Sequence, residues 1–179
     1  VAARWADDII TLTERDRTLW TDAVCPKAQI TCIPNMAPSA SNMFSTSALK
    51  VMAVGRLTKQ KGFDRLLDAW RLIEKDRRST EWVLEIVGEG PEHTKLLQKI
   101  ISMQRVSIIP PIKNIENLYR DAGIIVSSSR YEGLPMVLLE ASAYGIPIVA
   151  FDCETGPAEI IAHGESGCLV PEGDIEGLA

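Results

Sequence analysis

Apolar residues along this chain recur in two patterns, short continuous runs and stripes at helical spacing. From Leu49 onward the runs predict buried strands, which are expected at 51–54, 82–87, 106–109, 124–127, 147–151 and 168–170. Between the runs, apolar residues return every three or four positions, as on the buried face of an amphipathic helix. Strands and helices that alternate in this way predict an α/β fold, a Rossmann-like parallel sheet flanked by helices on both faces.

The helical stripes predict core, not ligand contacts. The first helix is expected at 63–71, and the next two are marked by buried faces at Leu96, Leu97, Ile100 and Ile101 and at Ile115, Leu118, Tyr119 and Ala122. Two more helices are expected at 135–144 and 157–162.

The first fifty residues follow the pattern less regularly. A strand is expected at 6–13, a polar helix at 14–22 and a second short strand at 29–33. Residues 37–48 are rich in small polar side chains, a composition typical of a linker. We therefore expect a boundary here, with a separate segment at 1–35, a linker at 36–48 and the main domain at 49–179.

Charge and cysteine usage narrow the classes of protein. The chain has 179 residues and a formal net charge of −5, which argues against broad binding to nucleic acid. Its four cysteines form no CxxC pair and no metal-like spacing with His93 or His163, so no metal site is expected. They fit thiols in a reducing compartment. A cytoplasmic protein is therefore expected, and peripheral contact with the inner face of a membrane is compatible with that expectation.

Two glutamates, Glu132 and Glu140, flank a predicted change from loop to helix. Gly133 permits an unusual backbone angle, and Pro135 suits the first helical position. The free backbone N–H groups and the positive end of the helix dipole predict an anion site between the carboxylates. A ligand with a phosphate middle and hydroxyl-rich ends, such as a nucleotide sugar, has the matching form.

A basic loop follows the first strand of the main domain. It contains Arg56 and Lys61 between Gly55 and Gly62, at the sheet edge where ligands of such folds bind. A planar arginine fork and a mobile lysine charge suit a diphosphate. Two solvated cations on a surface turn are the alternative. The glycines are expected to let the backbone approach the ligand.

The remaining loops are less specific. Gly88 and Gly90 form a GxG that does not continue as GxGxxG, which leaves a tight turn and a ligand contact equally open. Pro110 is a candidate rigid wall for a nucleobase. Thr155 or Gly156 is expected to cap the helix that follows.

Taken together, these stretches resemble the family 4 glycosyltransferases, retaining enzymes of the GT-B architecture. The matching motifs are Gly-Arg-x4-Lys-Gly at 55–62, Gly-x-Gly-Pro at 88–91, Tyr-Glu-Gly-Leu-Pro at 131–135, the Glu-x7-Glu spacing, Glu-Ala-x-Ala-x-Gly-x-Pro at 140–147 and Gly-x-Leu-Val-Pro-x-Gly-Asp at 167–174. Each motif is modest alone, and their combination in this order is specific.

The resemblance implies a role for each candidate residue. Arg56 and Lys61 would hold the donor diphosphate, Glu132 would contact the hydroxyls of the donor sugar, and Glu140 those of the ribose. Further contacts to phosphates, ribose and base would come from Gly55, Gly88, Gly90, Pro110, Gly133, Leu134 and Val137. Cationic side chains and a helix terminus would act in place of a divalent metal ion.

The implied reaction is transfer of a hexose or N-acetylhexosamine from a nucleotide diphosphate sugar, with UDP ahead of GDP, to a glycan or lipid-linked acceptor in polysaccharide biosynthesis. Residues 1–35 would be the tail of the acceptor-binding N-terminal domain. Residues 49–179 would be a donor domain truncated at its C-terminus, which binds donor without turnover. The apolar faces of the tail would be left without their partner domain and would favour self-association. A non-catalytic nucleotide-sugar binding module and an epimerase or phosphorylase of the same architecture are the alternatives.

Overall fold

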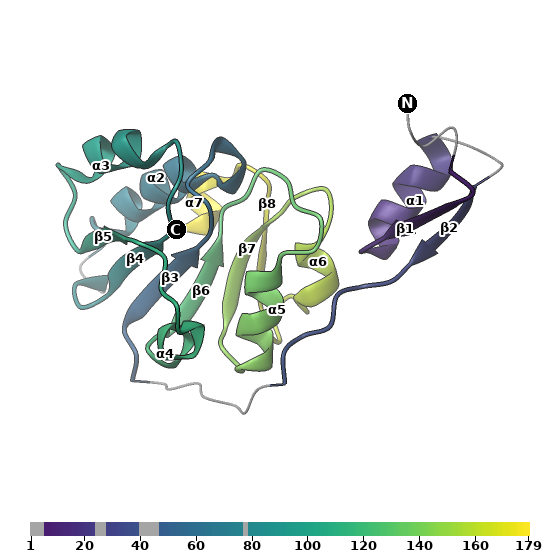
Figure 1. Ribbon diagram of the computed structural model, residues 1–179. Helices are drawn as coiled ribbons and strands as arrows, with labels where there is room; N and C mark the ends of the chain where they lie inside the picture. The colour runs from purple at the N-terminus through teal and green to yellow at the C-terminus, as the bar shows by residue number, and fades with distance from the viewer. Residues whose placement is uncertain (1–5, 24–27, 40–46, 77–78) are drawn as a thin grey trace.

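The computed structural model describes residues 6–23, 28–39, 47–76 and 79–179. Two units of secondary structure are visible in Figure 1, and an extended segment leads from the first toward the second. The first unit consists of β1 (Asp8–Thr11), α1 (Glu14–Ala23) and β2 (Gln29–Cys32), and its two strands pair in parallel. Parts of the predicted tail (1–5 and 24–27) and of the predicted linker (40–46) lie outside the described residues.

The second unit is built on a parallel sheet of six strands. The strands are β3 (Lys50–Val54), β4 (Val83–Val87), β5 (Val106–Ile109), β6 (Ile124–Ser127), β7 (Ile148–Asp152) and β8 (Gly167–Pro171). Their order across the sheet is β5-β4-β3-β6-β7-β8, and every neighbouring pair is parallel. The predicted α/β class and its parallel sheet are therefore confirmed.

Helices cover both faces of this sheet (Figure 1). The short 3-10 helix η2 (Lys59–Lys61) leads into α2 (Phe63–Ile73), and the remaining helices are α3 (His93–Ile100), α4 (Ile115–Arg120), α5 (Met136–Ala143), α6 (Pro157–Ile160) and α7 (Ile175–Leu178). One core packs α2, α3 and α7 around Trp70, and the other packs α4, α5 and α6 around Leu138. Both side chains are almost fully buried, and burial of each stabilises the fold by about 2–3 kcal/mol.

The predicted buried face of α3 is half wrong. Leu96 is buried and Ile100 packs against the core, but Leu97 is 39% exposed and Ile101 is 83% exposed. The helix ends at Ile100, and Ile101 is the residue that caps it. Neighbouring positions on a helix point about 100° apart, and in α3 only one member of each adjacent apolar pair faces the core.

Several glycines allow loops to pack against one another. A Cβ atom on Gly88 would lie 1.9 Å from the carbonyl oxygen of Gly55, and one on Gly62 would lie 2.0 Å from that of Ser128. Gly62 also has a left-handed φ of 65°. The glycines around the basic loop are thus required by contacts between backbone segments, a role that the sequence interpretation did not give them.

The two units are joined by contacts of α1 with α6 and with the end of β7. The Glu159 carboxylate accepts hydrogen bonds from the backbone N–H groups of Glu14 and Arg15, both at 2.9 Å. The Arg15 guanidinium reaches Asp152 at 3.3 Å. A carboxylate at a helix N-terminus satisfies donors that have no partner within the helix and complements the helix dipole. Glu159 therefore acts as the cap of a helix that lies 145 positions away in the chain.

Candidate functional site

The sheet brings the two predicted site loops together. The strand order reverses between β3 and β6, and ligands of doubly wound sheets bind beyond the carboxyl ends of the strands at such a switch point. The loop with Arg56 and Lys61 follows β3, and the loop with Glu132 follows β6. These neighbouring strands place the basic loop and the acidic loop at one edge of the sheet.

Lys61 and Glu132 form the centre of this edge. The Nζ atom of Lys61 lies 2.6 Å from Oε1 of Glu132, and the Ser129 hydroxyl donates to the same oxygen at 2.6 Å. Only 7% of the Glu132 side chain is exposed, against 24% for Lys61. A carboxylate this buried needs a cation and hydrogen-bond donors to remain charged, and both are present.

The loop after β7 contacts the backbone of Glu132 and Gly133. The Thr155 hydroxyl donates to the Glu132 carbonyl oxygen, and Gly156 packs against the backbone of Gly133. Gly156 has a φ of 98°, and a Cβ atom there would lie 2.5 Å from the Gly133 oxygen. Gly156 is the N-cap of α6, as predicted, whereas the Thr155 hydroxyl serves the site loop. Sequence reasoning missed that contact because it joins segments that are separate in the chain.

The start of α5 offers uncapped backbone. Pro135 is the N-cap residue and not the first helical residue, and no side chain of the described residues caps this end. The prediction for Pro135 was therefore displaced by one position. The unusual backbone angle expected at Gly133 is also not found, because Gly133 is not among the glycines with a positive φ. The helix N-terminus still lies at the carboxyl edge of the sheet, close to Lys61 and Glu132, whose side chains share a small hollow with Val137.

A larger hollow of about 320 Å³ extends from this edge over the ends of β3, β4 and the loop after β5. It is lined by Val54, Gly55, Arg56, Val87, Gly88, Glu89, Pro111, Ile112 and Ile115. Arg56 also borders an open basic hollow with Lys59, Lys61 and the exposed ring of Tyr131. Among the predicted contact residues, Pro110 is not part of this lining, whereas its neighbour Pro111 is, and Gly90 packs against the backbone of Leu57.

Glu140 is held by a residue that the sequence assigned to the core. The Tyr119 hydroxyl of α4 donates to Oε2 of Glu140 in α5, and the Tyr119 ring stacks on Tyr144 with centroids 5.1 Å apart. Burial and then the hydrogen bond to the carboxylate raise the pKa of Tyr119 above its ordinary value. The bond orients one carboxylate oxygen and leaves the other for a further donor.

The raised pKa of Tyr119 predicts an alkaline loss of stability. The neutral phenol is favoured in the fold, so this stabilisation is complete below the unfolded pKa of about 10 and is lost as the pH rises above it. In urea titrations between pH 9 and 11, the unfolding free energy is expected to fall by up to about 1.4 kcal/mol per pH unit from this group. Tyr119→Phe is expected to show a shallower slope, and an unchanged slope would contradict the assignment.

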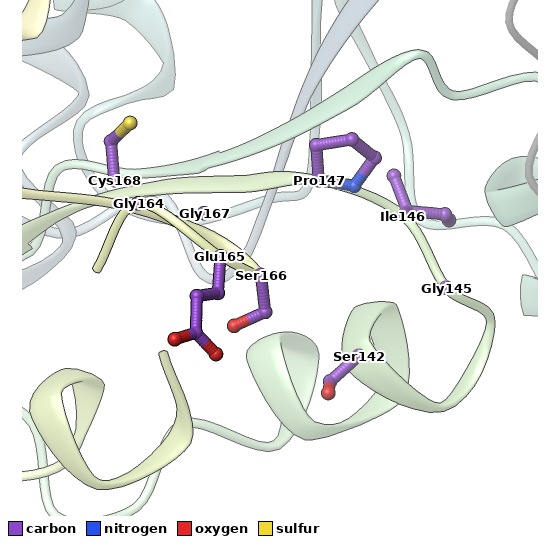
Figure 2. A pocket seen from close by; sticks show the side chains of 9 residues that line it. All are labelled: Ser142, Gly145, Ile146, Pro147, Gly164, Glu165, Ser166, Gly167 and Cys168. Carbon is purple, nitrogen blue, oxygen red and sulfur yellow. The ribbon is translucent and has the colours of Figure 1, made fainter. Parts of the chain in front are cut away.

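A separate hollow of about 350 Å³ lies at the opposite edge of the sheet (Figure 2). The residues that line it lie just before β7, or just before and at the start of β8. They are Ser142, Gly145, Ile146, Pro147, Gly164, Glu165, Ser166, Gly167 and Cys168. This edge carries the amino ends of the strands, away from Lys61 and Glu132. Its lining contains no cation, which makes it a poor place for a phosphate.

A membrane-spanning helix and a metal centre are two other features that the described residues can be checked for. Within the described residues, no helix is long and apolar enough to cross a membrane. Over the same parts of the chain, no three side chains of His, Cys, Asp or Glu are grouped to hold a metal ion. Of the four cysteines, Cys32, Cys153 and Cys168 are free thiols, and Cys25 lies outside the described residues.

The fold and site define a doubly wound α/β domain with a charged ligand site at its switch point. The sequence profile of the glycosyl transferases group 1 matches residues 48–179. The amylovoran biosynthesis glycosyltransferase AmsD of Erwinia amylovora is 42% identical over 167 residues, which cover 87% of this chain and 46% of that protein. The chain therefore belongs to the group 1 glycosyltransferases, which form family 4, and most of it is the C-terminal domain of their GT-B fold.

Solved structures agree with this placement. A TarM variant from S. aureus, crystallised with fondaparinux, alpha-GlcNAc-glycerol and UDP, has a TM-score of 0.90 and 25% identity, over 98% of this chain and 36% of that one. The lipopolysaccharide outer core galactosyltransferase WaaB, in its apo form, has a TM-score of 0.81 and 25% identity, over 96% of this chain and 50% of that one. The chain spans about half the length of the curated relatives that it matches first.

Proposed function

We propose that this chain is the donor-binding half of a retaining glycosyltransferase. The donor is a UDP-hexose or UDP-N-acetylhexosamine, and the acceptor is a glycan or a lipid-linked glycan in polysaccharide biosynthesis. The observation that carries the proposal is the ion pair of Lys61 and Glu132 beside Arg56 and the uncapped start of α5, all at the switch point of the sheet.

The charges at this edge suit the two ends of such a donor. Arg56 is exposed, and within the described residues its guanidinium has no hydrogen-bond or ion-pair partner, so it is available to a diphosphate. Lys61 adds a second cation, and the start of α5 adds backbone donors. Glu132 accepts sugar hydroxyls with its second oxygen, and Glu140 accepts ribose hydroxyls with the oxygen that Tyr119 leaves free. The hollow beside Arg56 holds the base.

In the proposed reaction, the bond between the anomeric carbon and the β-phosphate oxygen breaks and UDP leaves with the electron pair. The acceptor hydroxyl oxygen forms the new bond on the same face of the sugar, and its proton passes to a phosphate oxygen of the departing UDP. Arg56 and Lys61 offset the negative charge that grows on the diphosphate, and this stabilisation is greater in the transition state than in the ground state.

UDP is supported as the donor nucleotide by the TarM complex, which contains UDP. The test is a thermal-shift series of the chain with UDP, GDP and ADP. A ligand at a hundred times its dissociation constant adds about 2.7 kcal/mol of stability, equivalent to a rise of about 5–10 °C in Tm for a chain of this size. UDP is expected to produce this shift at the lowest concentration. A stronger response to GDP would contradict the assignment of UDP, and no response to any nucleotide would contradict the donor site.

Transfer itself is expected only when an acceptor domain is present. The isolated chain is expected to bind UDP without releasing it from a UDP-sugar at a rate above the uncatalysed one. The longer enzyme is expected to form a product with the anomeric configuration of the donor. Measurable turnover by the chain alone would contradict the first expectation, and an inverted anomer in the product would exclude retention. The alternatives would behave differently from a transferase: a binding module would transfer nothing, and an epimerase would change the sugar without an acceptor.

A further inference from the structure

The three carbonyl groups of η2 are all held by the loop after β6. The Arg130 guanidinium donates to the Lys59 oxygen at 2.6 Å, and the Arg130 backbone N–H donates to the Gln60 oxygen at 2.8 Å. The Ser128 hydroxyl donates to the Lys61 oxygen at 3.0 Å. Within this single turn only the Lys59 oxygen has a local donor, the Gly62 N–H at 3.3 Å, so the external donors fix the position of the turn. Arg130 supplies two of the three.

Arg130 is itself held in place by α2. Its two terminal nitrogens donate to the two carboxylate oxygens of Asp64 at 2.9 and 2.7 Å, the paired geometry that an arginine fork favours. The guanidinium holds the pKa of Asp64 below its ordinary value, so the pair stays ionised near neutral pH. One planar group therefore links the start of α2, the first carbonyl of η2 and the Glu132 loop.

Lys61 and Glu132, the two side chains proposed to bind the ligand, are close in sequence to the segments that Arg130 holds. Lys61 is the last residue of η2, and Glu132 is two positions after Arg130. The Gln60 side chain adds a reciprocal bond, from its amide to the Tyr131 carbonyl oxygen at 3.0 Å. Arg130 lines none of the three hollows at this edge, so it is placed to act on a ligand only through the residues that it positions.

We propose that Arg130 is a positioning residue. By fixing the backbone of η2, it fixes the position of Lys61 at the switch point and so determines how tightly the diphosphate is bound. The proposal rests on the proposed function, because it assigns the diphosphate to Lys61. Arg130→Lys keeps the charge but loses the fork, since one ammonium group cannot hold both Asp64 oxygens and the Lys59 carbonyl in one plane. The nucleoside end of the ligand lies over the other loops and should not respond.

The test compares uridine, UMP and UDP binding to the chain by calorimetry and NMR titration. Arg130→Lys is expected to weaken UDP binding about tenfold and to leave uridine binding within about twofold of the original. The matched control is Arg65→Lys at the position after Asp64 in α2, because the Arg65 guanidinium pairs with Glu172 and not with η2. This control is expected to keep the original ratio of UDP to uridine affinity. Asp64→Asn, which removes the anchor of Arg130, is expected to shift the ratio in the same direction.

The same measurements test the diphosphate site and the positioning role of Arg130 separately. Failure of the unsubstituted chain to bind UDP more tightly than uridine contradicts the proposed function. If that chain discriminates, an unchanged ratio in both Arg130→Lys and Asp64→Asn shows that the pair only stabilises the fold, and it overturns the inference. Amide hydrogen exchange gives a ligand-free readout: the Gly62 amide is expected to exchange faster in Arg130→Lys than in Arg65→Lys, and equal rates would count against the positioning role.

Discussion

Lys61→Met is expected to lower the free energy of unfolding by about 3–5 kcal/mol and to remove most UDP binding. The methionine fills similar space but leaves the Glu132 carboxylate, only 7% exposed, without its cation. The Ser129 hydroxyl remains as a donor, and one neutral hydrogen bond does not offset the desolvation of a charge. Urea denaturation of the ligand-free chain measures the first effect, and calorimetry with UDP measures the second.

A double-mutant cycle separates these two roles of the pair. Glu132→Gln combined with Lys61→Met replaces both charges with neutral groups of similar size, so most of the lost stability is expected to return. UDP binding is not expected to return, because the cation proposed to hold the diphosphate is still absent. A loss below about 1 kcal/mol in Lys61→Met would show that the pair behaves as an exposed one, and the structural account of the site would be wrong.

Arg56→Ala is expected to produce the opposite combination, a large loss of binding with little change in stability. The side chain is exposed and, within the described residues, has no partner, so the unfolding free energy should change by less than about 0.5 kcal/mol. A lost charge-assisted hydrogen bond to a phosphate weakens UDP binding on the order of 10- to 100-fold. Calorimetry of UDP and uridine shows whether the loss falls on the diphosphate end.

The matched control for this substitution is Arg120→Ala. Arg120 is also exposed, and it lies beside Lys50 at the amino edge of the sheet. Its removal changes the net charge equally but is expected to leave UDP binding within about twofold, because a separation beyond the Debye length screens its charge. Equal effects of the two substitutions would show that Arg56 acts through the general field of the protein and not through contact.

The hydrophobic pattern was sufficient to predict the strands and most helices. Each buried strand of a parallel sheet is a continuous apolar run, and each covering helix repeats on one face, so both signals are local. The error at Ile101 arose where the pattern continued past the end of a helix. Periodicity does not show where a helix stops when the next residue is also apolar.

The partners of the site residues were beyond prediction from the sequence. Lys61 and Glu132 are 71 positions apart, and they meet because β3 and β6 are neighbours in the sheet. Hydrophobic periodicity does not determine strand order. For the same reason the sequence did not reveal that Tyr119 would bind Glu140 or that Thr155 would support Glu132. The motifs identified the residues, and the topology paired them.

The capping of α1 by Glu159 has a consequence for joining unrelated halves of such enzymes. The carboxylate recognises two backbone amides, which every residue except proline possesses, so it does not depend on the side chains of the incoming helix. A foreign N-terminal domain should dock against this C-terminal domain if it presents a helix start at the same place. The Glu159 contacts therefore leave the helix sequence exchangeable, and the one side chain of the helix with a described contact at this junction is Arg15, which pairs with Asp152.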